Sequence, residues 1–290
     1  MHVLLTGAGG FLASYLLPIL TRDHQVTAVV RRETAPLAGE RQVVLDLAAP
    51  LSRGALPARV DAVMHLAQSP RYREFPEGGL DLFEVNVGST ARLLDYARCA
   101  GASHFVLASS GAVYEPFDGP LAEDRPVAPR SFYATTKVMA EGLLDAYRDS
   151  FRVCALRPFF PYGPGQRDRL VPEMIARIAG GEPVTLNGGS EGPRIALTAA
   201  ADTTAIMARA LDDGWQGVVN VASGEGITIR RLAELIGEEL HRKVHFQGQP
   251  DAGVVDMIPD LERLRRLVPE WRFQPLTQGL RETVEAQAQR

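Results

Sequence analysis

Thr6-Gly7-Ala8-Gly9-Gly10-Phe11-Leu12-Ala13 follows the apolar run Val3-Leu4-Leu5 and opens a segment of helical period. A glycine-rich turn between a strand and a helix lets backbone amides at the helix start face a pyrophosphate. Gly7 permits the tight turn, Gly10 lets the backbone approach the phosphates, and Ala13 stands where a small residue allows close helix packing. The stretch therefore predicts a dinucleotide-binding unit, with a plain strand-to-helix turn as the alternative. The cofactor contacts expected here are Gly7, Gly10, Phe11 and Leu12.

Short β-branched or leucine-rich runs alternate with longer segments of helical period through the first half of the chain. The expected strands are Val3–Leu5, Val26–Val30, Val43–Leu45, Ala62–His65, His104–Ala108 and Arg152–Arg157. The expected helices are Phe11–Arg22, Leu80–Ala100 and Phe132–Ser150. This alternation predicts an α/β fold of Rossmann type, a doubly wound parallel sheet.

After Arg157 the rhythm breaks into a run of proline and glycine that is too rich in breakers to form an element. We expect a smaller C-terminal substrate-binding lobe to begin there. Its expected helices are Val171–Ala179, Ile229–His241 and Pro275–Gln289, and the strands expected after Arg157 are Pro183–Asn187 and Gly217–Val221. The predicted dinucleotide-binding domain is 1–165 plus the returning segment 194–224, and the predicted substrate-binding lobe is 166–193 plus 225–290.

Composition argues against several classes of partner. The 290 residues carry a net charge of −4 with 23% charged residues, so no global positive field exists to attract nucleic acid or anionic membrane. His241 and His245 have a helical ligand spacing, but the residues between them look like the entry to a strand, so no metal site is expected. A small-molecule substrate is the expected partner.

Cysteine use and the N-terminal residues indicate a cytoplasmic protein. Cys99 and Cys154 stand far apart in the sequence, which predicts two buried free thiols in a reducing compartment. The chain starts at once with an apolar strand and has no basic leader. No apolar run approaches the roughly 20 residues that a membrane span needs.

The end of the second expected strand bears on the cofactor. An acidic side chain at this place favours a free ribose 2′-hydroxyl, whereas an arginine accommodates a 2′-phosphate. Here the strand ends in Val29-Val30-Arg31-Arg32, and no acid follows until Glu33. Arg31 and Arg32 therefore favour NADP over NAD, with solvation of a strand end as the alternative.

Tyr133 and Lys137 stand in Ser131-Phe132-Tyr133-Ala134-Thr135-Thr136-Lys137. A four-residue spacing on a helix places the phenol and the ammonium on one face, where the cation lowers the phenol's pKa and prepares it for proton exchange near neutral pH. Alone, this spacing is common on helices. Together with the glycine turn it predicts nicotinamide redox chemistry.

Seven ordered motifs resemble those of the extended short-chain dehydrogenase/reductase family, which contains nucleotide-sugar epimerases, dehydratases and reductases. They cover nearly the whole chain and are Gly7-x-x-Gly10-x-x-Ala13, Asp46-Leu47, His65-Leu66-Ala67, Asn86-Val87, Ser109-Ser110-Gly111-Ala112-Val113-Tyr114, Tyr133 with Lys137, and Leu156-Arg157-Pro158-Phe159-Phe160-Pro161-Tyr162-Gly163-Pro164. The resemblance implies further cofactor contacts at Asp46, Leu47, Leu66, Ala67, Tyr133, Lys137 and Pro158. It also implies a homodimer formed through the helices 80–100 and 132–150.

The roles implied by the resemblance agree with the chemistry of the side chains. A substrate hydroxyl must lose a proton as its carbon loses hydride, so one group must take the proton and another must hold the oxygen. Tyr133 would be the acid/base, and Lys137 would lower its pKa and hold the nicotinamide ribose. Ser110 would donate to the substrate oxygen, with Ser109 as the alternative.

Residues that distinguish the subclasses of this family limit the expected type of reaction. Dehydratases of the family place an Asp-Glu pair just after the serine or threonine, and decarboxylating members place a glutamate two residues before the tyrosine of the Val-Tyr pair. This chain has Gly111 and Ala112 there. The strand also lacks the cysteine of members that invert C3 and C5. A 4-epimerase or a 4-keto reductase remains, with a non-catalytic dinucleotide sensor as the alternative from another class.

Two departures affect the expected substrate contacts. Phe160 stands where the family commonly has an asparagine that contacts the nucleotide diphosphate. Arg194, in Gly192-Pro193-Arg194, resembles a diphosphate clamp, with a surface salt bridge as the alternative. A nucleotide sugar is the favoured substrate class, with Ser110, Phe160 and Arg194 as the substrate-binding residues.

Overall fold

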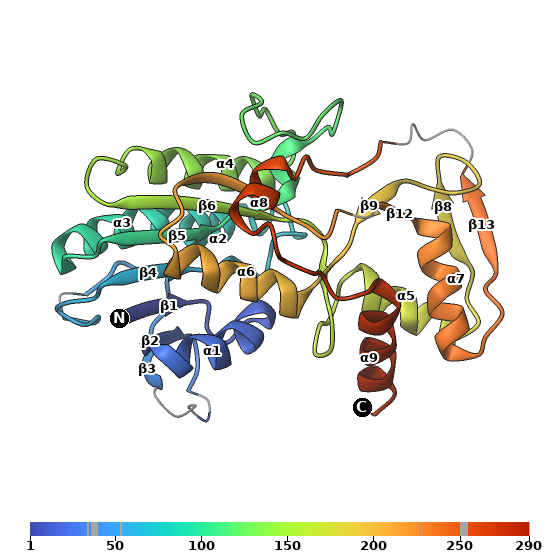
Figure 1. Ribbon diagram of the computed structural model, residues 1–290, viewed down its shortest axis with the longest axis horizontal. Helices are drawn as coiled ribbons and strands as arrows, with labels where there is room; N and C mark the ends of the chain where they lie inside the picture. Colours follow the sequence, from blue (N-terminus) through green and yellow to red (C-terminus); the bar gives the residue numbers. More distant parts are fainter. Residues whose placement is uncertain (34, 36–39, 53, 225, 250–254, 290) are drawn as a thin grey trace. The chain divides into compact units, whose positions relative to one another are not determined.

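The computed structural model describes residues 1–33, 35, 40–52, 54–224, 226–249 and 255–289. The chain forms two compact units (Figure 1). The first consists of Met1–Glu115, Glu123–Pro158 and Thr204–Val219, and the second consists of Pro116–Ala122, Phe159–Thr203 and Asn220–Arg290.

A seven-stranded sheet in the order β11-β6-β5-β4-β1-β2-β3 is the framework of the first unit. Its strands are β1 (His2–Thr6), β2 (Gln25–Val30), β3 (Glu40–Val44), β4 (Ala62–His65), β5 (His104–Ala108), β6 (Arg152–Pro158) and β11 (Gly217–Val221). Neighbouring strands from β3 through β6 run parallel. Every residue of β4 and β5 is buried, as in strands covered on both faces. The predicted α/β fold of Rossmann type is confirmed.

The helices of the first unit follow the sequence prediction in part. They are α1 (Phe11–Asp23), α2 (Gly79–Phe83), the π-helix η1 (Glu84–Gly88), α3 (Ser89–Ala100), the 3₁₀ turn η2 (Gly111–Tyr114) and α4 (Phe132–Asp145). The single helix expected over 80–100 is thus interrupted by a π-turn, and α4 ends five residues before the expected end. A further helix, α6 (Ala200–Asp212), belongs to this unit from Thr204 on and was not predicted.

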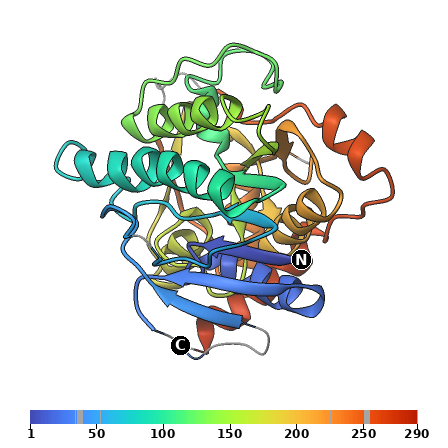
Figure 2. The same cartoon turned by 90° about the vertical axis from the view of Figure 1, so that its left-hand side faces the viewer.

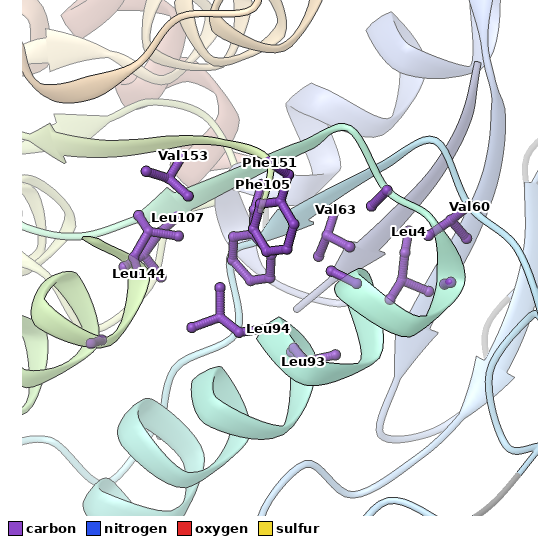
Figure 3. Close-up of a cluster of buried hydrophobic side chains, with 14 of the residues drawn as sticks. Leu4, Val60, Val63, Leu93, Leu94, Phe105, Leu107, Leu144, Phe151 and Val153 are labelled. Atoms are coloured by element: carbon purple, nitrogen blue, oxygen red, sulfur yellow. The ribbon is translucent and has the colours of Figure 1, made fainter. Parts of the chain in front are cut away.

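A buried apolar cluster joins the sheet to α3 and α4 (Figure 3). Phe105 of β5 and Phe151 stack with ring centroids 6.3 Å apart. Leu93 and Leu94 from α3 and Leu144 from α4 pack against the same group. This packing holds α4 beside β5 and β6, which fixes where the side chains of its first turns emerge.

The second unit is built from short strand pairs and three amphipathic helices. The elements are β7 (Pro161–Tyr162), α5 (Leu170–Ala179), β8 (Val184–Asn187), β9 (Arg194–Ala196), β10 (Thr198–Ala199), β12 (Gly226–Thr228), α7 (Ile229–Leu240), β13 (Phe246–Gln249), α8 (Glu262–Leu267) and α9 (Leu276–Ala288). Helices α5, α7 and α9 share one apolar core, which includes Ile175, Leu232 and Leu280. The helices expected in this region are confirmed.

The two units differ from the expected domains at four segments. Residues 116–122, 159–165, 194–203 and 220–224 were expected in the first domain, and they belong to the second unit. For 159–165 and 194–203 the reason is strand pairing, because β10 pairs with β7 and β9 pairs with β12. The assignment of cofactor and substrate roles to the two parts stays a prediction.

Both cysteines are free thiols, but only one is buried. Cys154 lies within β6, whereas Cys99 is exposed on α3, where its sulfur accepts a hydrogen bond from the Arg98 guanidinium at 3.3 Å. The expectation that both are buried was therefore wrong for Cys99. Among the described residues, no helix has the length and apolar character needed to cross a bilayer.

Candidate active site

The glycine turn requires glycine at its first position for two reasons. Gly7 has φ +72°, in the left-handed region that favours glycine. A Cβ added there would lie 2.6 Å from the backbone nitrogen of Ala67. Gly7 O accepts the N–H of Gly10 at 2.9 Å, which closes the turn. The turn therefore packs directly on the backbone that leaves β4.

The start of α1 fits a bound pyrophosphate. Gly10 is the N-cap, and within the described part of the chain no side-chain hydrogen bond caps this helix start. A Cβ added to Gly9 would meet no atom within 4 Å, so the turn has open space beside it. Uncapped amides at a helix start are an anion site. The predicted contacts Phe11 and Leu12 are the first two residues of this helix.

The other predicted cofactor residues follow neighbouring parallel strands. Arg31 and Arg32 are exposed directly after β2, and Asp46 and Leu47 follow β3. β2 and β3 are in register at Val30 and Val44, so their carboxyl ends meet at one sheet edge. Leu66 and Ala67 leave β4, whose neighbour in the sheet is β1. The carboxyl edge of an open parallel sheet is where α/β folds bind ligands.

Tyr133 and Lys137 lie in the first half of α4. Ser131 caps this helix, since its hydroxyl oxygen accepts the N–H of Ala134 at 3.3 Å. The Lys137 ammonium lies 5.9 Å from the centroid of the Tyr133 ring and donates to Ala108 O at 2.9 Å. Burial lowers the pKa of Lys137 from 10.5 to about 8, although the charge of Glu141 acts in the opposite direction. The helix thus places the pair at the carboxyl end of β5.

The two serines after β5 have different environments. Ser109 is buried, and its hydroxyl donates to the carboxylate of Glu141. Ser110 caps η2, with its oxygen accepting the N–H of Ala112 at 3.2 Å. A hydroxyl that accepts through its oxygen can still donate its proton to a ligand. The contacts therefore favour Ser110 over Ser109 as the donor to a substrate oxygen.

A buried ion pair supports this strand end. Arg157 on β6 donates to both carboxylate oxygens of Glu141, at 3.0 and 2.7 Å. Its remaining nitrogen donates to the Tyr114 hydroxyl at 2.7 Å. Arg157 and Tyr114 stand in the sequence motifs, but their contact was not predicted. Glu141, one helical turn after Lys137, was not predicted as a site residue.

His65 is a structural residue of the sheet edge. Its ring bridges the hydroxyls of Thr6 at 2.6 Å and Thr90 at 3.1 Å. Burial, and secondarily the charge of Lys137, lower the pKa of His65 to about 3. The ring is therefore neutral near neutral pH and ties β1 and β4 to α3.

Two side chains that contact the tyrosine were also missed by the sequence analysis. The Tyr133 hydroxyl donates to Gln68 Oε1 at 3.2 Å. The ring of Tyr72 lies 5.4 Å from the Tyr133 ring, centroid to centroid. Both residues follow the motif His65-Leu66-Ala67, which was the only sequence signal near them.

Two of the predicted substrate-binding residues, Phe160 and Arg194, belong to the second unit. Phe160 is half-buried against the core of that unit and has φ +39°, a left-handed conformation in which asparagine is enriched. Arg194 begins β9, with an exposed side chain and a backbone N–H donating to Asp256 Oδ1 at 2.8 Å. Pro158 ends β6 in the first unit. Two shallow hollows beside α7 and β13 contain none of the predicted site residues.

The turn at α1 and the tyrosine–lysine pair of α4 define a nicotinamide-dinucleotide enzyme of the short-chain dehydrogenase/reductase type. The family model described as the NAD dependent epimerase/dehydratase family matches residues 3–222. The chain belongs to this family.

Three related proteins illustrate the activities within the family. The dTDP-4-dehydro-6-deoxy-D-allose reductase of a Streptomyces species is 28% identical over 309 residues, which cover 97% of this chain and 94% of the relative. The structure of MoeE5 in complex with UDP-glucuronic acid and NAD has 28% identity, a TM-score of 0.86 and coverage of 100% of this chain and 99% of that one. The UDP-glucose 4-epimerase of Thermus thermophilus in complex with NAD has 26% identity, a TM-score of 0.81 and coverage of 99% of both chains.

Proposed function

We propose that this enzyme acts on one carbinol or keto carbon of a nucleotide sugar, as a 4-epimerase or a 4-keto reductase. The observation that carries the proposal is the pairing of Tyr133 with buried Lys137 at the carboxyl end of β5, beside Ser110. Relatives that act on or bind nucleotide sugars support the substrate class.

The residues of the first unit have defined tasks in this chemistry. A bound nicotinamide dinucleotide supplies or accepts the hydride. The Tyr133 hydroxyl exchanges a proton with the substrate oxygen, and Ser110 donates a hydrogen bond to that oxygen. The Lys137 cation favours the ionised phenol and offers a donor to the ribose. Neither Gly111 nor Ala112 supplies an acid for expelling water, so dehydration is outside the proposal.

We also infer a preference for NADP, on the basis of Arg31 and Arg32. Both side chains are exposed immediately after β2, and no acid stands between the end of β2 and Glu33. The related structures hold NAD, so the inference depends on these two arginines alone. We also propose a homodimer through the helices of 80–100 and 132–150, with the exposed face of α2 and α4 as part of its interface. The two free thiols support the predicted cytoplasmic location.

Epimerase and reductase differ in how they use the cofactor. An epimerase retains oxidised cofactor through purification and needs none added. A reductase consumes added reduced cofactor in proportion to product. The relatives include one of each kind, so the amount of cofactor consumed during turnover decides between them.

A panel of nucleotide sugars and their 4-keto derivatives, assayed with NADPH and with NADH, tests the function. We expect turnover with the wild-type enzyme and a loss of about 10²- to 10⁴-fold in kcat for Tyr133→Phe, because the variant cannot exchange the proton. Cofactor binding by the variant is the control for folding. Dinucleotide binding without turnover of any sugar would favour the alternative of a non-catalytic sensor, and an unchanged rate in the variant would remove Tyr133 from the mechanism.

A further inference from the structure

The loop that leaves β4 brings a neutral amide to the hydroxyl of Tyr133. Gln68 Oε1 accepts the hydrogen bond of the phenol at 3.2 Å, and both side chains are half-buried. Tyr72, from the same loop, covers part of the Tyr133 ring at 5.4 Å. The phenol is therefore held from its hydroxyl end and along its ring by one short segment.

That segment is fixed at the residue next to Gln68. Ser69 is fully buried, and its N–H donates to Asn86 Oδ1 at 3.1 Å. Its hydroxyl donates to the carboxylate of Asp81 and accepts the N–H of Arg71 at 3.1 Å. These bonds tie the loop to α2 and η1, so the position of the amide is set by buried groups rather than by solvent.

Further hydrogen bonds connect Asn86 to the backbone of Tyr133. Asn86 Nδ2 donates to Thr136 Oγ1 at 2.9 Å, and the Thr136 hydroxyl donates to the carbonyl of Tyr133 at 2.7 Å. A closed circuit results, in which Ser69, Asn86 and Thr136 connect the loop with α4 and Gln68 completes it at the phenol. Linked hydrogen bonds of this kind reinforce one another.

An amide suits a group that changes its protonation state. Its oxygen can accept from a neutral phenol, and its NH₂ group can donate to a phenolate after rotation of the terminal torsion. Among the described residues, the charged and titratable groups near Tyr133 include Lys137 on α4, Tyr72 and Arg73 on the loop, and Glu115, whose carboxylate accepts the N–H of Ser131 at 2.9 Å. His65, whose pKa burial lowers to about 3, ends β4 where the loop begins. Gln68 adds no charge to this set.

We propose that Gln68 is a positioning residue of the catalytic site, whose amide hydrogen-bonds the Tyr133 oxygen in both protonation states and aims it at the substrate oxygen. The proposal rests on the proposed function. In the oxidative direction the Tyr133 phenolate takes the proton of the substrate O–H bond while the substrate carbon would give its hydride to the oxidised nicotinamide cofactor of the proposed function, and the amide keeps both of its hydrogens. In the reductive direction the same proton returns to the substrate.

A titration of Tyr133 tests the contact without any turnover. Enzyme labelled with ¹³C at the tyrosine Cζ carbon gives signals from 7 tyrosines, and loss of one signal in Tyr133→Phe assigns it. In Gln68→Glu we expect the apparent pKa of Tyr133 to rise by about one unit or more, since a nearby negative charge disfavours the phenolate. Gln25→Glu, an exposed site on β2, adds the same charge elsewhere and is expected to leave the titration unchanged.

Kinetics provide the second measurement. Gln68→Met keeps the size of the side chain and removes its hydrogen bonds, so we expect kcat to fall about tenfold, equivalent to a well-placed hydrogen bond, with KM for the sugar unchanged. A melting temperature equal to that of the wild type excludes a folding defect. A Tyr133 signal in Gln68→Glu that titrates at the wild-type pH, or full kcat in Gln68→Met, overturns the proposal. If no sugar is turned over, the titration still decides the role of Gln68.

Discussion

At Gly7, both the backbone conformation and the packing require a glycine. Alanine there must adopt φ +72° and place a Cβ 2.6 Å from Ala67 N, so the turn or the β4 backbone has to move. The conformation alone costs about 1–2 kcal/mol. We expect Gly7→Ala to lower the unfolding free energy by more than that and to weaken dinucleotide binding, as measured by denaturant titration and calorimetry.

Gly9→Ala is the matched control, because an added Cβ meets nothing within 4 Å. We expect its stability to equal that of the wild type. If a pyrophosphate occupies this open space in the complex, the added methyl group competes with it. The dinucleotide affinity of Gly9→Ala then falls although its stability is unchanged. Equal stability of Gly7→Ala and the wild type would contradict the packing argument.

The lowered pKa of Lys137 predicts how kcat depends on pH in the alkaline range. Burial lowers its pKa from 10.5 to about 8, so the cation is present below that pH and is lost above it. Since the charged form assists Tyr133, we expect kcat to decline above about pH 8, by tenfold per unit once the group is neutral. Lys137→Arg keeps the charge at all these pH values, and its residual rate should lack this decline. A wild-type profile that stays flat to about pH 10 would exclude the role.

The candidate site was predictable where the sequence has fixed spacing. Tyr133, Lys137 and the glycine turn are local patterns, and helix or turn geometry converts their spacing into proximity. Gln68 and Glu141 were missed because their contacts join segments distant in sequence, Gln68 to Tyr133 and Glu141 to Arg157. Sequence periodicity does not predict these contacts, because they depend on the order of the strands in the sheet and on helix packing.

At the scale of elements, the π-turn η1 is the most consequential departure from the sequence pattern. Apolar periodicity predicts one continuous helix over 80–100, and the structure inserts Glu84–Gly88 between α2 and α3. π-turns inside helices frequently mark functional sites. Here the turn carries Asn86, which bonds the β4 loop and Thr136 of α4.

Thr136→Val tests this connection between elements. Valine has nearly the shape of threonine but leaves Asn86 Nδ2 without its acceptor and the Tyr133 carbonyl without this donor. We expect a loss of about 1–3 kcal/mol in unfolding free energy and a several-fold loss in kcat. Thr21→Val removes a comparable hydroxyl, bonded to Leu17 O at 3.0 Å in α1, and should leave kcat unchanged. Equal kinetics in both variants would show that the circuit does not affect catalysis.

Other elements escaped prediction for simpler reasons. α6 begins Ala200-Ala201-Asp202-Thr203-Thr204, where small and β-branched residues give no clear apolar stripe. β7, β9, β10 and β12 have only two or three residues each, too few to show alternation. β3 starts earlier than expected, since Glu40 and Arg41 are tolerated on an edge strand.

For the molecule as a whole, the exposed apolar residues bear on the proposed homodimer. Among the large exposed hydrophobic residues of the described chain, Leu80 is 75% exposed, Met139 48% and Phe83 37%. They belong to α2 and α4, which contact each other, and Phe75 stacks on Phe132 at the start of α4 with ring centroids 5.0 Å apart. Figure 2 shows α3 and α4 side by side in this layer. Exposed apolar groups on two contacting helices are a candidate interface for the proposed homodimer.

Sedimentation of Leu80→Glu tests the proposed homodimer. If a second copy covers this face, one buried unpaired carboxylate on each chain disfavours association by several kcal/mol, so we expect a dimer for the wild type and a monomer for the variant at micromolar concentration. Val255→Glu changes another exposed apolar residue, 40% exposed and outside both helices, and should remain dimeric. A wild-type protein that sediments as a monomer at tens of micromolar would contradict the homodimer, and then the apolar face of α2 and α4 would require another partner.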